Sequence, residues 1–198
     1  PDIYREPGEF DMAGFAVGVV EKNKIINGRK RIEKGDVILG LASSGVHSNG
    51  YSLARNICFK KLKLSPDKPV DQLQGRTIGD ELLEPTRIYV KPVIKLLRKY
   101  KIKKVVHGMA HITGGGLEGN IVRVLPENCN AVINKNSWPR PAIFDFLAEK
   151  GPVDEKEMFR VFNMGVGFTL IVAKDFANSI IKKLEKYGES VYKIGKIT

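Results

Sequence analysis

An apolar run followed by a loop of small polar residues most constrains what this chain can fold into. Val37–Ala42 has the length and composition of a buried strand. Three serines, an asparagine and two glycines follow, and Leu53 and Ile57 then take up helical i, i+4 spacing. Glycines allow close approach of the backbone to a ligand, and a helix N-terminus offers free N–H groups, so this order predicts an anion-binding loop. The alternative is a polar turn in which Ser48 or Asn49 caps the helix.

Two further loops have the same character. His111-Ile112-Thr113-Gly114-Gly115-Gly116 precedes a helix expected over Leu117–Leu125. Three consecutive glycines are costly to order, so they indicate a backbone that turns sharply or lies against something. Phe162–Gly167 leads into an apolar strand expected over Phe168–Ala173. The three loops together predict a binding site built from loops.

Five motifs follow one another along the chain: Asp11-Met12-Ala13-Gly14-Phe15, Ser43–Leu53, Leu82–Val90, His111–Gly116 and Phe162–Gly167. Together they closely resemble the C-terminal domain of the phosphoribosylformylglycinamidine cyclo-ligases, also called aminoimidazole ribonucleotide synthetases. The Pro-Thr-Arg-Ile-Tyr-Val segment within the third motif favours this family over selenophosphate synthetase, thiamine-monophosphate kinase, a hydrogenase maturation factor and a glutamine-dependent amidotransferase. One position departs from the family, which usually has Pro where this chain has Val46.

The resemblance implies a fold and a domain organisation. The implied class is α+β, a three-layer alpha/beta/alpha arrangement with a mixed sheet. Residues 1–198 would form a single domain, the C-terminal domain of a two-domain enzyme. In the family an N-terminal domain precedes this point and supplies much of the nucleotide and metal site. We therefore expect the chain to be a fragment that is inactive alone.

The resemblance also implies a reaction. The family uses ATP to close the imidazole ring of formylglycinamidine ribonucleotide, giving aminoimidazole ribonucleotide, ADP and phosphate in purine biosynthesis. The expected cofactors are ATP and Mg²⁺, both held mainly by the N-terminal domain. The expected partners are the phosphoribosyl substrate, that N-terminal domain and a second copy in a homodimer of the complete enzyme.

Candidate site residues lie in the motifs that carry the resemblance. His111 is the predicted catalytic residue, because a neutral imidazole there would accept a proton or polarise the formyl oxygen. His47 and Arg87 are expected either to bind phosphate or to have a structural role, which for Arg87 would be an ion pair. Asn163 and Gly165 complete the pocket wall or form a tight turn. The predicted substrate or phosphate contacts are Ser43, Ser44, Gly45, His47, Ser48, Asn49, Gly50, Arg87, Thr113, Gly114, Gly115, Gly116, Asn163 and Gly165.

The histidines and cysteines do not show metal-ligand spacing, so we assign no metal site. His107, beside Val105 and Val106, is expected to be structural. Cys58 and Cys129 indicate a reducing, cytoplasmic setting.

The remaining elements follow from periodicity. Ala13–Val20 is apolar on both alternating faces and predicts a central strand covered on both sides. Leu64–Gly75 and Glu127–Pro139 are expected surface excursions, with Trp138 a packing anchor. Helices are expected over Gly50–Phe59, Pro92–Tyr100, Leu117–Leu125, Pro141–Lys150 and Asp175–Tyr187, and a last strand near Val191–Ile197.

The net charge of +11 raises the question of a nucleic-acid partner. The lysine clusters lie beside helices whose other face is apolar, and no aromatic residues are interleaved with them, so we expect solvated faces and no nucleic-acid partner. No apolar stretch approaches the roughly 20 residues needed to span a bilayer, so we expect no membrane partner. The charge would attract anionic substrates. Three alternatives stay open: another ATP-dependent member of the superfamily, of the selenophosphate synthetase or amidotransferase type, a phosphometabolite-binding module without catalysis, and a nucleic-acid accessory domain.

Overall fold

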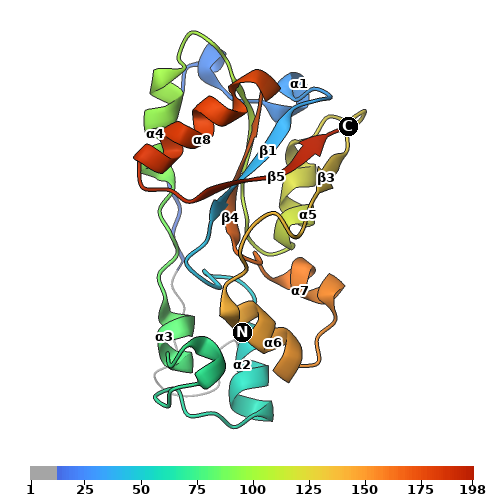
Figure 1. Cartoon of the computed structure of the whole chain (residues 1–198). Coiled ribbons are helices and arrows are strands. Elements are labelled where there is room, and N and C mark those ends of the chain that lie inside the picture. The colour runs from blue at the N-terminus through green and yellow to red at the C-terminus, as the bar shows by residue number, and fades with distance from the viewer. Residues whose placement is uncertain (1–12) are drawn as a thin grey trace, which may run out of the picture.

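A computed structural model describes residues 13–198 and places a five-stranded sheet at their centre. The strand order is β2-β4-β1-β5-β3, and every neighbouring pair is antiparallel (Figure 1). The strands are β1 (Val37–Ala42), β2 (Val106–His111), β3 (Ala131–Ile133), β4 (Val166–Val172) and β5 (Val191–Ile197).

Helices cover both faces of the sheet, which confirms the α+β class and the three layers. On one face, α4 (Val90–Lys99) and α8 (Ala177–Lys186) pack against Leu39 and Leu41 of β1. On the other, α1 (Gly28–Arg31) and α5 (Gly116–Ile121) are adjacent to a cluster around Ile38. Successive side chains of a strand point to opposite faces, so one strand serves both cores.

The expected mixed sheet is the one feature of the fold class that differs. Strand β1 leaves the sheet at the end from which β4 later returns, because both connect to the same group of helices (Figure 1). Neighbours that leave and enter at one end run in opposite directions. The pairing is therefore antiparallel, and strand composition alone does not record this.

That group of helices forms what we call the helical lobe, which lies beyond one end of the sheet (Figure 1). Its core contains Phe144, Leu147 and Phe162, each fully buried. The lobe comprises α2 (Tyr51–Arg55) with its π-helical continuation Asn56–Lys61, α3 (Ile78–Leu83), α6 (Ala142–Lys150) and α7 (Glu155–Val161). Short 3-10 helices occupy Lys22–Lys24, Asp71–Leu73, Val122–Val124 and Lys174–Phe176.

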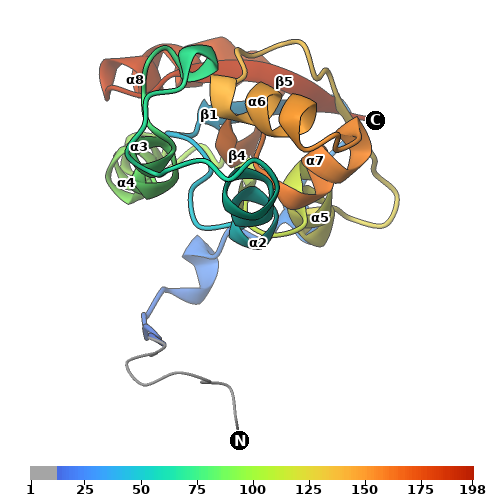
Figure 2. The same cartoon turned by 90° about the horizontal axis from the view of Figure 1, so that it is seen from below.

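The predicted central strand over Ala13–Val20 is wrong for this structure. No described strand pairs with these residues, and the segment runs away from the body of the molecule (Figure 2). Phe15, Val17 and Val19 are 94%, 86% and 100% exposed. A strand that is apolar on both faces needs a neighbouring strand and two covering layers, and this segment has neither among the described residues. Asp11 and Met12 of the same motif lie outside the described residues.

The two expected surface excursions are partly built into the core. Residues 64–75 bury Leu73 in the helical lobe, and residues 127–139 contain β3. Trp138 is 7% exposed, and its Nε1 donates a hydrogen bond to the Met164 carbonyl oxygen at 2.8 Å, which confirms the packing anchor. None of the described helices is long and apolar enough to cross a membrane.

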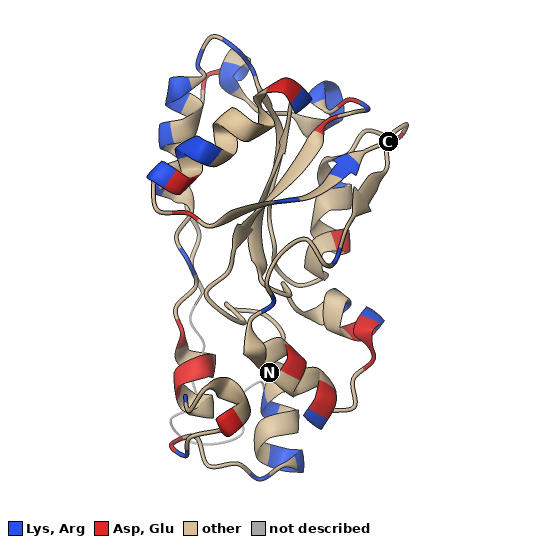
Figure 3. Cartoon of the chain, in the orientation of Figure 1, with Lys and Arg blue, Asp and Glu red and all other residues tan. Residues whose placement is uncertain are grey.

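Lysines and arginines gather on the outer faces of α4 and α8 (Figure 3). The inward faces of these helices bury Val93, Leu96 and Ile180, so the lysines lie on the solvated side, as expected. Aromatic rings do lie beneath some of them: Lys95 Nζ is 4.2 Å from the ring centre of Tyr187. These contacts hold the two helices together within one molecule.

Candidate active site

Three of the predicted loops, together with the segment before α4, meet where the sheet joins the helical lobe (Figure 1). The chain crosses from sheet to lobe in the β1–α2 loop (residues 43–50) and returns in the α3–α4 loop (residues 84–89) and the α7–β4 loop (residues 162–165). The β2–α5 loop (residues 112–115) leaves the same end of the sheet. Segments far apart in sequence are thus adjacent.

Asn163 fastens the α7–β4 loop to the β1–α2 loop. Its Oδ1 accepts hydrogen bonds from Ser43 Oγ at 2.9 Å and from the Gly165 N–H at 2.8 Å. Its Nδ2 donates to the carbonyl oxygens of Gly45 and Val46 at 2.8 and 3.1 Å. Asn163 is only 3% exposed. Its amide group is fully used in joining the two loops. Val46, at the position where the family usually has proline, is also buried.

His47 is a buried organiser of the two neighbouring loops. Its Nε2 accepts hydrogen bonds from the backbone N–H groups of Ser44 at 3.1 Å and Arg87 at 3.4 Å. Burial, together with the smaller effects of the charges of His111 and Arg87, lowers its pKa from 6.5 to about 4. The ring is therefore neutral, with its proton on Nδ1 because Nε2 is an acceptor. With 3% exposure, His47 is placed as a structural residue.

The α3–α4 loop is tied to the β1–α2 loop by further hydrogen bonds. Ser44 Oγ donates to the Pro85 carbonyl oxygen at 2.6 Å, and the hydroxyls of Ser48 and Thr86 are 2.8 Å apart. Tyr89 Oη donates to the carbonyl oxygen of Ala42, the last residue of β1, at 2.7 Å. Burial raises the pKa of Tyr89, so its hydroxyl remains a donor.

Arg87 forms the ion pair that was its alternative role. Its Nε lies 3.2 Å from Glu189 Oε2, and its Nη2 donates to the Gly188 carbonyl oxygen at 3.1 Å. Glu189 is 8% exposed, at the turn that leads into β5. The guanidinium therefore anchors the α3–α4 loop to the start of β5.

The β2–α5 loop is held from both sides. Asn49 Oδ1 accepts a hydrogen bond from the Gly114 N–H at 3.0 Å, which joins this loop to the β1–α2 loop. Asn120 Nδ2 donates to the carbonyl oxygens of Thr113 and Gly116 at 3.1 and 2.7 Å. The sequence analysis did not select Asn120. The signal in the sequence was a polar residue on a helix beside the apolar Leu117 and Ile121, and the structure shows that it is buried.

Glycines are needed here for packing as well as for turning. A Cβ on Gly116 would lie 1.7 Å from the Phe159 carbonyl oxygen, and its φ is +62°. A Cβ on Gly50 would lie 2.3 Å from the Phe162 ring, with φ +80°. Both positions therefore require glycine because of their neighbours within the protein.

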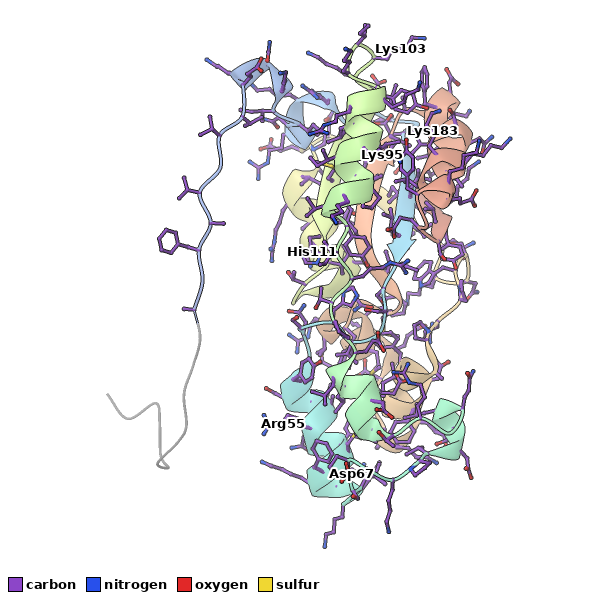
Figure 4. All side chains as sticks on the ribbon, turned by 90° about the vertical axis from the view of Figure 1, so that its left-hand side faces the viewer. Arg55, Asp67, Lys95, Lys103, His111 and Lys183 are labelled. Carbon is purple, nitrogen blue, oxygen red and sulfur yellow. The ribbon has the colours of Figure 1, made fainter. Side chains whose placement is uncertain are left out.

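His111 ends β2 and is exposed at this junction (Figure 4). Its ring centre lies 6.3 Å from that of Tyr89 and 6.2 Å from that of Phe168. Tyr89 also lies 6.2 Å from His47, so one buried tyrosine separates a buried histidine from an exposed one. Only His111 of this pair is accessible to a substrate.

The predicted contact residues thus divide into two groups. The accessible or partly accessible residues form a rim, and the buried residues hold it in place. The rim consists of Ser44, Ser48, Asn49, Gly50, Arg87, His111, Thr113, Gly114 and Gly115, and the buried support consists of Ser43, Gly45, His47, Gly116, Asn163 and Gly165.

The carboxylates near these loops are engaged with arginines. Glu81 and Glu84 pair with Arg76, and Glu189 pairs with Arg87. Among the described residues, the one group of three potential metal ligands lies elsewhere in the sheet. A Mg²⁺ ion prefers several oxygen ligands including carboxylates, so the donor set of these loops does not fit such a site.

Comparisons with known proteins show the family to which this chain belongs. Residues 33–198 match the family model described as "AIR synthase related protein, C-terminal domain". The chain is 52% identical over 197 residues to a phosphoribosylformylglycinamidine cyclo-ligase of Clostridium tetani, which covers all of this chain and 55% of that protein. It is 49% identical over 197 residues to the cyclo-ligase of Syntrophotalea carbinolica, with 54% of that protein covered.

A solved structure shares the fold at low identity. Thiamine-monophosphate kinase from Stenotrophomonas maltophilia superposes with a TM-score of 0.57 at 16% identity, covering 86% of this chain and 49% of that one. The chain spans about half the length of the relatives it matches. With the family model matching most of its residues, the chain belongs to the AIR synthase related proteins and corresponds to their C-terminal domain.

Proposed function

We propose that this chain is the C-terminal half of a cytoplasmic phosphoribosylformylglycinamidine cyclo-ligase. The complete enzyme would convert formylglycinamidine ribonucleotide and ATP into aminoimidazole ribonucleotide, ADP and phosphate. Relatives of that name match the chain along its whole length. The observation that carries the proposal is the junction at which four loops meet around an accessible His111. Two free cysteines, Cys58 and Cys129, agree with a reducing compartment.

The reaction needs a better leaving group than a formamide oxygen. In the proposed mechanism the γ-phosphoryl group of ATP passes to that oxygen and ADP leaves. A nitrogen of the amidine then attacks the same carbon, the carbon–oxygen bond breaks, and inorganic phosphate departs. The nitrogen loses a proton as the ring closes. In this proposal His111 would accept that proton, or would polarise the formyl oxygen before the transfer.

The rim would supply the contacts to phosphate groups. Ser48 and Thr113 offer hydroxyl groups, and Gly114 and Gly115 offer a backbone without side chains in the way. Phosphoryl transfer depends on positioning and charge stabilisation more than on covalent chemistry. The buried support would therefore act on the rate by fixing the rim. Mg²⁺ would be held by residues other than those of these loops.

The exposed segment of residues 13–20 supports the proposal that this chain contacts a partner domain. Phe15, Val17 and Val19 alternate along an extended backbone and have no cover among the described residues. We propose that they join the N-terminal domain of the same enzyme, the part of the relatives that this chain does not span. The complete enzyme would form a homodimer, and ATP would be held mainly by that domain.

The test is ADP release from ATP in the presence of formylglycinamidine ribonucleotide. We would compare this chain alone with a polypeptide extended upstream to the full length of its relatives. The proposal expects turnover in the extended form only, and a loss of at least a hundredfold in its His111→Ala variant. Asn178→Ala, at an exposed position on α8 away from the rim, is the control and should keep its turnover.

The outcomes separate the alternatives. No turnover by the extended protein with this substrate would overturn the cyclo-ligase assignment and direct the search to the substrates of the related ATP-dependent enzymes. Binding of a phosphorylated sugar without ADP release would favour a binding module. Normal turnover by His111→Ala would remove His111 from the catalytic role while leaving the overall reaction in place.

A further inference from the structure

A second group of chemically active side chains lies at the other end of the sheet. Glu33 and Asp36 stand between α1 and β1, and His107 is the second residue of β2. One ligand atom from each residue lies within 4.8 Å of the others. The loops of the candidate active site begin after Ala42 and His111, at the far ends of the same two strands.

A tight turn fixes the Asp36 carboxylate beside the backbone of Glu33. The Asp36 N–H donates to the Glu33 carbonyl oxygen at 3.2 Å, and the Glu33 N–H donates to Asp36 Oδ2 at 3.1 Å. Gly35, with φ +95°, allows the chain to reverse between them. Asp36 is 2% exposed and rigidly held, whereas Glu33 is exposed and can move.

A β-bulge brings the histidine to the same place. Val106 pairs with Val172 and Gly108 with Ile171, so His107 is an extra residue in β2. A bulge redirects the side chain of the inserted residue. Here it places His107 Nδ1 2.7 Å from Asp36 Oδ2.

A simple hydrogen-bonded pair accounts for two of the three residues. It explains Asp36 and His107, but it leaves the Glu33 carboxylate without an ion-pair partner among the described residues. Two ligands at about 2.0–2.2 Å from one metal ion can be no more than about 4.4 Å apart. All three ligand atoms lie within 4.8 Å of one another, and Asp36 Oδ2 and His107 Nδ1 are only 2.7 Å apart, so a rotation of the exposed Glu33 side chain would bring the set within that limit.

We propose that Glu33, Asp36 and His107 form a binding site for a divalent transition-metal ion, of which Zn²⁺ is the best fit. One imidazole nitrogen and two carboxylate oxygens suit Zn²⁺ and its neighbours better than Mg²⁺ or Ca²⁺, which favour oxygen ligands alone. Metal binding requires the neutral ring to carry its proton on Nε2, so that Nδ1 is free to coordinate. Water would complete the coordination.

The expected role is structural. The ion would tie the end of α1 to the first residues of β1 and β2. Five residues of strand, at about 3.3 Å each, separate this site from the candidate active site. That distance, roughly 16 Å, removes the ion from the ring-closing chemistry. The inference does not depend on the proposed function.

The experiment uses the whole chain after treatment with a chelator. Zn²⁺ binding would be followed by calorimetry, Co²⁺ binding by visible absorption, and stability by thermal unfolding. We expect one saturable site, with an affinity at least tenfold weaker in Glu33→Gln and in His107→Gln. Zn²⁺ should raise the Tm of the wild type and not that of His107→Gln, because only a ligand of the folded state stabilises it.

The controls keep the test decisive. Glu33 is exposed, so Glu33→Gln should fold even if His107→Gln does not. His111→Gln removes a histidine outside the cluster and should bind Zn²⁺ like the wild type. The absence of saturable binding in the micromolar range, or equal affinity in wild type and Glu33→Gln, would overturn the proposal.

Discussion

Replacing Asn163 by alanine should destabilise the protein much more than a typical polar substitution. The side chain takes part in hydrogen bonds with Ser43, Gly45, Val46 and Gly165, all within the buried junction of sheet and helical lobe. Alanine removes both the amide donor and the amide acceptor. The partner groups are left without hydrogen bonds in a place that is largely closed to water.

The magnitude follows from those contacts. A hydrogen bond contributes about 1 kcal/mol net, and a buried group left unsatisfied costs about 1–3 kcal/mol. Rearrangement recovers part of the loss at a junction near the surface, so we expect about 3 kcal/mol for Asn163→Ala. For a chain of this length that loss lowers Tm by roughly 6–12 °C. Asn163→Asp keeps the shape but faces the Gly45 and Val46 carbonyl oxygens with a carboxylate oxygen, so it should lose at least as much.

Urea unfolding followed by circular dichroism measures the effect. The midpoint should fall while the m-value stays constant, because the same surface is exposed on unfolding. Asn178→Ala is the matched control: Asn178 is exposed on α8, and its replacement should change stability by no more than about 0.5 kcal/mol. A loss below about 1 kcal/mol for Asn163→Ala would refute the idea that this side chain fastens the loops.

Three further outcomes are expected. Burial raises the pKa of Cys58 to about 11, so a thiol reagent at neutral pH should leave it unmodified until guanidinium unfolds the chain. Cys129 lines a cavity of about 1040 Å³ between α5, α7 and β3 and should react before Cys58. The folded-state pKa of His47 lies below that of the unfolded chain, so the unfolded state binds more protons between pH 6.5 and about 4. The free energy of unfolding should therefore decrease as pH falls through that window. This pH dependence should be smaller in His47→Gln, and urea midpoints at several pH values measure it. Gly116→Ala should cost more than about 2 kcal/mol, because its Cβ meets the Phe159 carbonyl oxygen, and an unchanged Tm would contradict that packing.

Local sequence patterns located β1, β4 and β5, whereas β2 and β3 were not predicted. The strand predicted at Val37–Ala42 and the one near Val191–Ile197 have the observed bounds, because a short apolar run or a period of two has few other solutions. Helix α7 (Glu155–Val161) was missed, although Asp154 caps it by accepting a hydrogen bond from the Glu157 N–H at 2.8 Å. It is short, and its apolar residues are too few for a clear period.

The site was predicted less completely than the fold, for a physical reason. Sequence identifies which residue types gather in loops, but the partner of Asn163 is Ser43, 120 positions away. Whether a polar side chain faces a ligand or holds a loop depends on such long-range contacts. Arg87 is paired with Glu189 in this structure, and the contacts of the rim, Arg87 included, with substrate remain a prediction.

The uncovered apolar side chains of residues 13–20 have a consequence for handling the protein. An extended backbone that pairs with no strand among the described residues, and that carries exposed Phe15, Val17 and Val19, is a template for strand addition between copies. The net charge of +11 opposes such contacts by repulsion between molecules. Added salt screens that repulsion over about 10 Å at 0.1 M. Concentrated solutions of this chain should therefore be clearest at low ionic strength and turn turbid as salt is raised.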